Sequence, residues 1–594
     1  MLALHHLTIP ASRFPTPPLL HEHPRCRLHL PAMKPEHSHY VAATALWDYQ
    51  LLFMSQRLET SQPITLHPVE GSLPRDFPSG TYYLIGPGQM SDDHGSMVSP
   101  LDGHGYLRVF EVDGENGTVR YQGKYVRTEV WEEEYDVVNA SWRFSHRGPF
   151  SVLKGGKVVG NVKVMKNVAN TSVLWWGGRL FCLWEGGVPY EIDKGSLDTI
   201  GRFDIGLGKG GDGVVDDGVG DVLDVVAGLL KPVLYGIFRM PPRRILSHYK
   251  VDSQRNRLLV MSCNAEDMLL PRSHFTFYEF DPNFNLLQTR EFSIDDHLMI
   301  HDWAFTDTRY ILFANRVKLD ASGSIRAVSG LSPMISALSV NPGKQTTPIY
   351  LLPRFVTTDG SWRVPVEAPT QLWLLHAANA FDTQDEENGN LCIWIHATAC
   401  SYQWFKFHQL FGYKWRNGWL DPSLMNADEG EVELLPHLVQ VSINLDARGH
   451  FQKCGVEPLS EHWTRPSDFS AINPEYAATR NTYVYAVTAS GFHPALPHFP
   501  FDTVLKLNTL DKSVRIWYAG SRRFVGEPVF VTKEPAAEDD GYLLVVEYAV
   551  SVQRCYLIVL NPKRIGEADA LVARFEVPKF LTFPYGFHGI WVSK

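Results

Sequence analysis

The sequence predicts an all-β protein folded as a β-propeller. From about residue 65 to the end, short apolar or alternating runs are separated by turns rich in Asp, Asn and Gly, as strands joined in hairpins require. Long helical periodicity is almost absent, and no change of composition marks an internal boundary. These observations favour one propeller over a string of sandwiches. Seven blades would need only roughly 280–350 residues, which leaves room for long loops over one face.

The N-terminal segment differs from the rest of the chain. Residues 1–40 are rich in Pro and His and have little apolar periodicity, which predicts a disordered extension before a propeller domain at 65–594. The start, MLALHHLTIPASRFP, lacks the basic and long apolar regions of a secretory signal. A transit peptide is the less favoured alternative, because Arg is modest although Glu22 and Glu36 are the only acids.

The strands of the domain are predicted from local pattern alone. Four segments read as strand, turn and strand: GYLRVFEVDGENGTVRYQGKYV, HFTFYEFDPNFNLLQTREF, LVQVSINLDARGHFQ and DTVLKLNTLDKSVRIWYAG. The same pattern of short apolar strands and turns recurs in SVLWWGGRLFCLWEGG, RLLVMSCNA, YILFANRV, LCIWIHATA, TYVYAVTA and GYLLVVEYAV. No WD-like or kelch-like repeat accompanies it, so the blades are not marked by a sequence signature.

One insertion, residues 206–242, interrupts this pattern of short strands and turns. It begins Gly/Asp-rich and then becomes apolar with interspersed charges, which predicts a loop followed by a short helix at Val222–Leu230, ended by Pro232. Two interpretations have equal weight: a helix that caps the propeller, or an interfacial patch through which an apolar substrate leaves a membrane.

Composition excludes several classes of protein. The net charge of −10, without a Lys/Arg-rich run, argues against a nucleic-acid partner. Seven cysteines without a CxxC pair favour a reducing compartment over a disulfide scaffold. No run of about eighteen uncharged apolar residues suggests a membrane span. We therefore expect a cytoplasmic protein, with a peripheral location on membranes or lipid bodies as the open alternative.

Four of the 24 histidines stand where a strand runs into a tight turn. They are His248 in ILSHYKVD, His301 in LMIHDWAFT, His376 in LWLLHAANAFD and His588 in FPYGFHGIWV. Their spacing matches neither an HExxH helix nor a Cys/His zinc module. Intervals longer than a blade are expected if each residue points to the central axis from a different blade. Spacing alone still favours core or surface histidines over a shared metal site.

The motifs around these histidines carry more information than their spacing. From about Pro68 to Lys594 the chain resembles the carotenoid cleavage oxygenase family, through VEGSLPRDFPSGTYYLIGPGQ, LDGHGYLRVFEVDG, YVRTEVWEEE, NTSVLWWGGRLFCLWEGGVPYEID, SHYKVD, IHDWAFT, HAANAFD, GEPVFV, EDDGYLLVV and FPYGFHGIW. The resemblance implies a seven-bladed propeller with a helical cap over the metal axis. It also implies that Fe(II) is held by four histidines, His248, His301, His376 and His588.

The resemblance also implies three carboxylates that orient the ligand histidines: Glu185 in LWEGGVP, Asp468 in SDFSAINP and Glu527 in GEPVFV. The second position is more often Glu in the family, so we expect a longer hydrogen bond or a bridging water at Asp468. His104 in LDGHGYLR resembles a turn motif of the family and is expected to be structural.

The implied reaction is cleavage of one C=C bond by O₂, giving two carbonyl products without flavin or nicotinamide. The expected substrate is a carotenoid or apocarotenoid. LIGPG, LDGHGYLR, NVKVMKNVANTSVLWWGGRL and LSHYKVD look most like the fungal branch that cleaves torulene in neurosporaxanthin biosynthesis. The alternatives are a stilbene-cleaving dioxygenase, with Lys166 as the phenol-binding lysine and Trp131 in the region of the partner Tyr, a retinal-forming β-carotene oxygenase, and a non-catalytic carotenoid-binding propeller.

Overall fold

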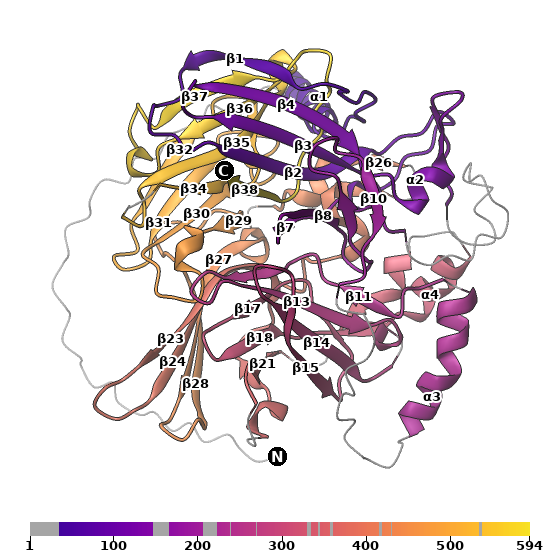
Figure 1. Ribbon diagram of the computed structural model, residues 1–594, viewed down its shortest axis with the longest axis vertical. Coiled ribbons are helices and arrows are strands. Elements are labelled where there is room, and N and C mark those ends of the chain that lie inside the picture. Colours follow the sequence, from indigo (N-terminus) through magenta and orange to yellow (C-terminus); the bar gives the residue numbers. More distant parts are fainter. Residues whose placement is uncertain are drawn as a thin grey trace, which may run out of the picture.

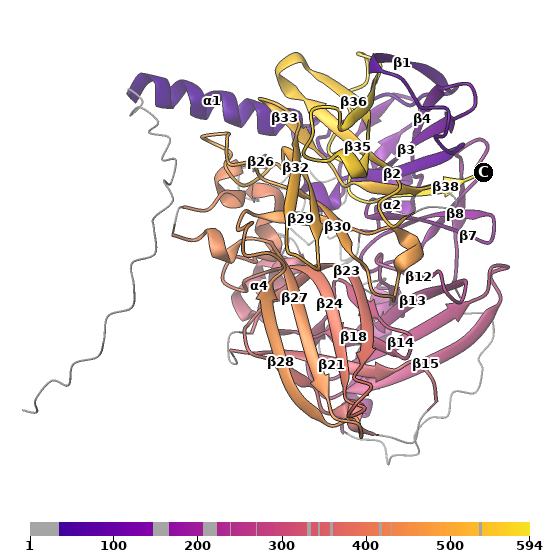
Figure 2. The same ribbon diagram turned by 90° about the vertical axis from the view of Figure 1, so that its left-hand side faces the viewer.

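The structure, a computed structural model, describes residues 35–146, 166–205, 222–237, 239–268, 270–329, 334–341, 345–356, 360–414, 418–428, 430–533 and 537–594. Of the expected extension at 1–40, residues 1–34 lie outside this range. Its last residues belong to helix α1 (Pro35–Leu51), which extends from the side of the molecule in Figure 2.

Seven antiparallel blades, counted over the described residues, confirm the predicted propeller. Five are separate sheets, and the ten-stranded sheet contains two more, which meet at β1 (Ile64–Gly71). In Figure 1 the inner strands β7, β17, β29 and β38 lie around the middle of the molecule. The blades are β38 (Gly589–Ser593), β2 (Gly80–Gln89), β3 (His104–Asp113), β4 (Thr118–Tyr125); β7 (Ser172–Trp176), β8 (Arg179–Leu183), β9 (Tyr190–Ile192), β10 (Thr199–Arg202); β11 (Arg243–Ile245), β12 (Lys250–Asp252), β13 (Arg257–Asn264), β14 (Ser273–Phe280), β15 (Leu286–Ile294); β17 (Trp303–Phe305), β18 (Arg309–Phe313), β21 (Thr347–Pro353), β22 (Val366–Ala368); β23 (Trp373–Gln384), β24 (Leu391–Cys400), β27 (His437–Leu445), β28 (Phe451–Pro458); β29 (Ser467–Ala471), β30 (Tyr483–Thr488), β31 (Thr503–Asn508), β32 (Val514–Tyr518); and β33 (Arg523–Val525), β34 (Val529–Thr532), β35 (Gly541–Ala549), β36 (Arg554–Leu560), β37 (Leu571–Glu576).

The two ends of the propeller domain close the ring together. Strand β1 pairs with β37 on one side and with β4 on the other. The C-terminal strand β38 pairs with β2, in the register Tyr82↔Trp591. Each end therefore completes a sheet with strands from the opposite end of the sequence. The C-terminal tail is held in place because its backbone groups are paired in the ladder.

Local sequence explains why these segments form strands. Residues of β4 alternate between exposed and buried, as expected of a strand with one face on the core. Strand β35 is buried along its whole length and is a near-continuous apolar run. The turn between β3 and β4 uses Asn116, whose side-chain amide donates to Asp113, and Gly117 at φ +64°, a conformation that favours glycine.

Short helices and small sheets make up the rest of the described chain; α1, β26 and α4 lie on one side of the blades in Figure 2. They are α2 (Glu129–Glu134), α3 (Val222–Lys231), the π-helix η3 (Pro232–Ile237), α4 (Ala321–Val328), and the small sheets β5 (Tyr135–Asp136) with β6 (Ser141–Trp142), β16 (Leu298–Met299) with β19 (Asn315–Leu319) and β20 (Leu338–Val340), and β25 (Tyr413–Lys414) with β26 (Trp419–Leu420). The 3₁₀ helices are η1 (Pro100–Asp102), η4 (Glu266–Met268), η5 (Met334–Ala337), η6 (Ser361–Arg363), η7 (Phe407–Gly412), η8 (Pro422–Met425), η9 (Val432–Leu434), η10 (Pro474–Tyr476), η11 (Val550–Val552) and η12 (Pro562–Arg564).

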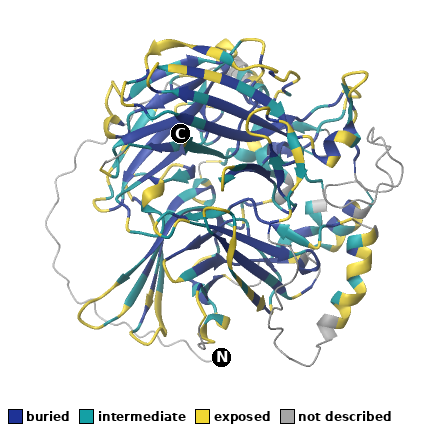
Figure 3. Ribbon diagram, viewed as in Figure 1, coloured by how far each residue is buried: buried dark blue, intermediate teal, exposed yellow. Residues whose placement is uncertain are grey.

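The predicted helix of the 206–242 insertion is present as α3, although residues 206–221 lie outside the described range. Helix α3 lies at the edge of the molecule and is largely exposed (Figure 3). Among the described helices, none combines the length and the apolar character that crossing a bilayer would need. The six described cysteines are all free thiols.

Candidate metal centre

The four predicted histidines lie within or next to strands of four different blades. His248 lies between β11 and β12, His301 two residues before β17, His376 within β23, and His588 immediately before β38. An inner strand ends or bends near the axis, so a side chain at that position points into the space that the blades share. Four segments that are far apart in the sequence therefore bring their histidines to the same place.

The histidine side chains form one cluster. Possible ligand nitrogens of His248, His301 and His376 lie within 4.8 Å of one another. The ring of His588 has its centroid 4.9 Å from those of both His248 and His376. The Nε2 atom of His248 is buried and has no hydrogen-bond partner. A buried nitrogen without a partner is costly in a folded protein, unless it serves as a ligand.

Burial keeps two of the imidazoles neutral. It lowers the pKa of His301 to about 3 and that of His248 well below its ordinary value, and the neighbouring histidines add to the effect at both. Burial also disfavours the charged form of His376, but the Asp468 carboxylate outweighs it and raises the pKa of that ring. Because a metal binds the neutral ring, the low pKa values of His248 and His301 favour ligation at neutral pH.

Two of the predicted carboxylates contact a histidine directly. Asp468 Oδ1 lies 2.7 Å from His376 Nδ1, and Glu527 Oε1 lies 2.8 Å from His588 Nδ1. A carboxylate at this distance accepts the Nδ1 proton, which leaves Nε2 of each ring as the lone-pair donor. The second oxygen of Glu527 accepts the backbone N–H of Gly589 at 2.8 Å.

The expectation of a longer bond or a bridging water at Asp468 is wrong. Strand β29 breaks register with β30 between Asp468 and Ala471, and Phe469 adopts φ +52°. This bulge changes the direction of the strand, so the short carboxylate reaches His376 without a mediator. The Phe469 ring also lies against His376, with centroids 5.3 Å apart.

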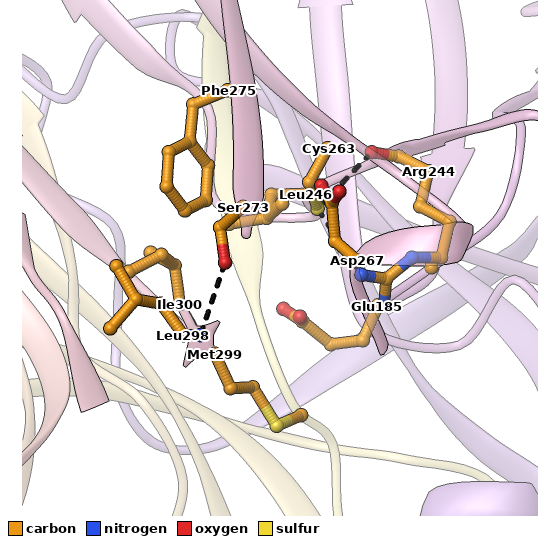
Figure 4. Close-up of a pocket in the computed structure, with 11 residues that line it drawn as sticks. Glu185, Arg244, Leu246, Cys263, Asp267, Ser273, Phe275, Leu298, Met299 and Ile300 are labelled. Carbon is orange, nitrogen blue, oxygen red and sulfur yellow. Dashed lines mark hydrogen bonds between the residues drawn. The ribbon is translucent and has the colours of Figure 1, made fainter. Parts of the chain in front are cut away.

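Glu185 does not make the direct contact that the resemblance implies. Its Oε1 lies 3.6 Å from both His301 Nδ1 and His248 Nε2, which is too long for a hydrogen bond, and accepts the hydroxyl of Ser247. Figure 4 shows the Glu185 carboxylate pointing into a narrow pocket that Arg244 and Cys263 also line. Burial in these surroundings raises the pKa of Glu185 to about 7.

A second buried polar cluster lies around His104. His104 Nε2 is 2.8 Å from the carboxylate of Glu134, which also accepts Lys166 Nζ at 3.0 Å and the hydroxyl of Ser145. The fully buried His104 is thus held within the protein, as expected of a structural residue. The ammonium of Lys166 is paired inside the protein as well.

Comparisons with known proteins establish the family. The family model described as retinal pigment epithelial membrane protein matches residues 53–593. The chain belongs to the carotenoid cleavage oxygenase family. It is 59% identical to "Carotenoid cleavage dioxygenase 7, chloroplastic" of Arabidopsis thaliana, over 93% of this chain and 91% of that protein. It is 57% identical to the protein of the same name in Oryza sativa, over 92% of both chains.

Solved structures of the family share the fold. The crystal structure of cobalt-substituted Synechocystis ACO superposes with a TM-score of 0.69 at 24% identity, covering 92% of this chain and 98% of that chain. At this identity the likeness bears on the fold, and it agrees with the propeller described above. The expectation of a carotenoid cleavage dioxygenase is thereby confirmed at the level of the family.

Proposed function

We propose that the protein is an Fe(II)-dependent dioxygenase that cleaves one C=C bond of a carotenoid with O₂. The observation that supports the proposal is the cluster of four histidines from four blades, in a chain that is 59% identical to a carotenoid cleavage dioxygenase. Four neutral imidazoles suit Fe(II), because they donate strongly without cancelling its charge. When bound, the iron would supply the activation of O₂.

The residues of the chain set the conditions for that chemistry. His248, His301, His376 and His588 would hold the iron. Asp468 and Glu527 fix the ring orientation and tautomer of His376 and His588, which leaves Nε2 of each ring as the lone-pair donor. Two oxygen atoms enter one C=C bond and two C=O bonds result. All four electrons come from the substrate, so the reaction needs neither flavin nor nicotinamide.

The proposed substrate class is a C₄₀ carotenoid or an apocarotenoid. The plant relatives at 57–59% identity carry carotenoid cleavage in their names, and a relative of 27% identity is named apocarotenoid-15,15′-oxygenase, from Synechocystis. A plant carotenoid is therefore our first candidate. Torulene, with the neurosporaxanthin route, and retinal-forming cleavage of β-carotene are further candidates that a substrate panel separates.

The stilbene alternative is disfavoured by the pairing of Lys166. A lysine that binds a phenol needs an available ammonium, whereas Lys166 is held by the buried Glu134. Trp131, in the region expected for the partner Tyr, is buried and carries no hydroxyl. The non-catalytic alternative, a propeller that only binds carotenoid, does not account for the four-histidine cluster, because binding an apolar polyene needs no group of imidazoles.

We further propose peripheral contact with a membrane through helix α3. The α3 patch, defined as Val225 and Leu229 of α3 together with Val233 of the adjoining π-helix η3, has relative exposures of 62%, 72% and 37%. Exposed apolar side chains on two consecutive short helices suit shallow insertion into a lipid surface. A C₄₀ polyene is essentially insoluble in water, so contact with a membrane would give access to it. The plant relatives are named chloroplastic, and we propose plastid membranes in place of the cytoplasmic location expected from composition.

One experiment tests the proposed function. The purified chain, loaded with Fe(II), is incubated with β-carotene, torulene, an apocarotenal and resveratrol, and the products are separated by chromatography. We expect aldehyde products from at least one carotenoid and none from resveratrol. Binding of carotenoid without any product would support the non-catalytic alternative, and cleavage of resveratrol would support the stilbene alternative.

A further inference from the structure

Asp302, the residue after His301, connects three of the segments that carry the histidines. Its carboxylate is 2% exposed and lies 2.7 Å from the ammonium of Lys250, two residues beyond His248. Its Oδ2 accepts the backbone N–H of Ala377, the residue after His376, at 2.7 Å. One buried carboxylate therefore joins β12, the start of β17 and β23, which belong to three different blades.

The contact to Ala377 falls where β23 is irregular. The pairing of β23 with β24 shifts register between Leu374 and His376 and again between Ala377 and Asn379. Strand β23 is also the inner edge of its sheet, so no further strand of that sheet lies beside it. Register shifts flank His376 and Ala377 on both sides, and β24 pairs with them from one side only. The hydrogen bond from Ala377 to Asp302 therefore constrains this short segment from its open side.

Trp303 adds a second connection from the same motif. Its indole Nε1 donates to the backbone carbonyl of His248 at 2.7 Å, and its ring is fully buried. Its backbone N–H donates to Asp302 Oδ1 at 2.7 Å. The sequence Asp302-Trp303 thus contacts the His248 segment twice, once through Lys250 and once through the backbone of the histidine itself.

From these contacts we infer that Asp302 is a positioning residue that sets the relative placement of His248, His301 and His376, with Trp303 as its partner on the His248 segment. The inference rests on the proposed function, because it assigns the residue to the assembly of the iron site. Asp302 does not touch the ligand atoms. It acts on the backbones that carry them, and its removal should loosen the cluster while the blades stay intact.

The test compares Asp302→Asn with Asp382→Asn. Asp382 is the control, because it is a partly buried carboxylate that also joins the β17 region to β23, through the Thr306 hydroxyl at 2.9 Å and the Thr308 hydroxyl at 3.3 Å. Metal-free protein is titrated with Co(II), and the dissociation constant and visible ligand-field spectrum are recorded beside the unfolding midpoint. We expect Asp302→Asn to weaken Co(II) binding by roughly 10–100-fold, with altered bands. Asp382→Asn should keep the wild-type affinity and spectrum.

A milder variant, Trp303→Phe, covers the case in which Asp302→Asn does not fold. It keeps a buried aromatic ring, although a smaller one, and removes the N–H donor to the backbone carbonyl of His248. It should shift the Co(II) bands with a smaller loss of affinity. Wild-type affinity and spectrum in the folded Asp302→Asn protein, or in Trp303→Phe if only that variant folds, would overturn the inference. Equal losses in Asp302→Asn and Asp382→Asn would also overturn it. A wild-type chain that binds no Co(II) would instead remove the proposed function, and this inference with it.

Discussion

Replacing Glu527 by Gln tests how the carboxylates support the metal site. In the structure the two oxygens of Glu527 accept two donors, Nδ1 of His588 and the backbone N–H of Gly589, each at 2.8 Å. A glutamine has one acceptor oxygen, so its NH₂ group must face one of these donors. A buried donor without an acceptor costs about 1–3 kcal/mol. If the metal-bound form bears that cost, the affinity of the protein for Fe(II) drops by roughly 5- to 140-fold, since about 1.4 kcal/mol corresponds to a factor of ten.

The assay is a chelator competition that measures the dissociation constant of Fe(II) under anaerobic conditions. A suitable control is Glu538→Gln, because Glu538 also accepts two backbone N–H groups, from Thr482 and Tyr483, at a position outside the histidine cluster. We expect Glu538→Gln to bind iron as the wild type does, whatever its effect on stability.

The same reasoning predicts an order among the three carboxylates. Asp468→Asn should weaken iron binding less than Glu527→Gln, because the asparagine oxygen can still accept from Nδ1 of His376, the donor that lies 2.7 Å from Asp468. Glu185→Gln should cost less, because Glu185 Oε1 lies 3.6 Å from each nearby imidazole nitrogen. Wild-type affinity in Glu527→Gln, or an equal loss in Glu185→Gln, would refute the link between direct hydrogen bonds and metal affinity.

Three further predictions concern the metal ligands, the membrane and pH. Alanine at any one of the four histidines should abolish turnover and reduce iron content. If a variant keeps the iron content and activity of the wild type, the histidine that it lacks is not a ligand. Serine at all three positions of the α3 patch should weaken liposome binding and slow cleavage of membrane-embedded carotenoid, while a detergent-dispersed apocarotenal is still cleaved. The control is serine at the exposed Leu286 and Leu287. Equal losses in both variants would contradict membrane contact through the α3 patch. The hydrogen bond to Asp267 raises the pKa of His274, so its stabilising effect is present below the ordinary histidine pKa and fades as pH rises through the raised value. His274→Gln should therefore lower the unfolding midpoint at pH 5.5 more than at pH 9, and a shift independent of pH would contradict this origin.

The propeller could be predicted because its strands are short and locally patterned. The alternation in β4 and the continuous apolar run of β35 are visible in sequence, and each matches the observed burial. The pairing of β1 with both β37 and β4 could not be predicted from pattern. It depends on which edges meet when the ring closes, and periodicity reports only which face of a strand is buried.

Some features of the candidate site could likewise be predicted from the sequence, and others could not. The four histidines could be singled out from the motifs around them, and the structure brings their side chains together. The direct contact of Asp468 was not predictable, because it depends on a bulge with a left-handed Phe469. Asp302 was also missed. Its residue type is visible beside His301, but its role arises from contacts to Lys250 and Ala377, which only the assembled blades bring within reach.

The central claim is that one iron, held by four histidines, enables this chain to cleave a carotenoid. The most direct test is an anaerobic titration of metal-free protein with Fe(II), in which each sample is then mixed with O₂ and carotenoid and the aldehyde product is measured. We predict no product without iron and a linear rise that ends at one iron per chain. Full cleavage by metal-free protein, or no cleavage at any iron loading, would contradict the claim.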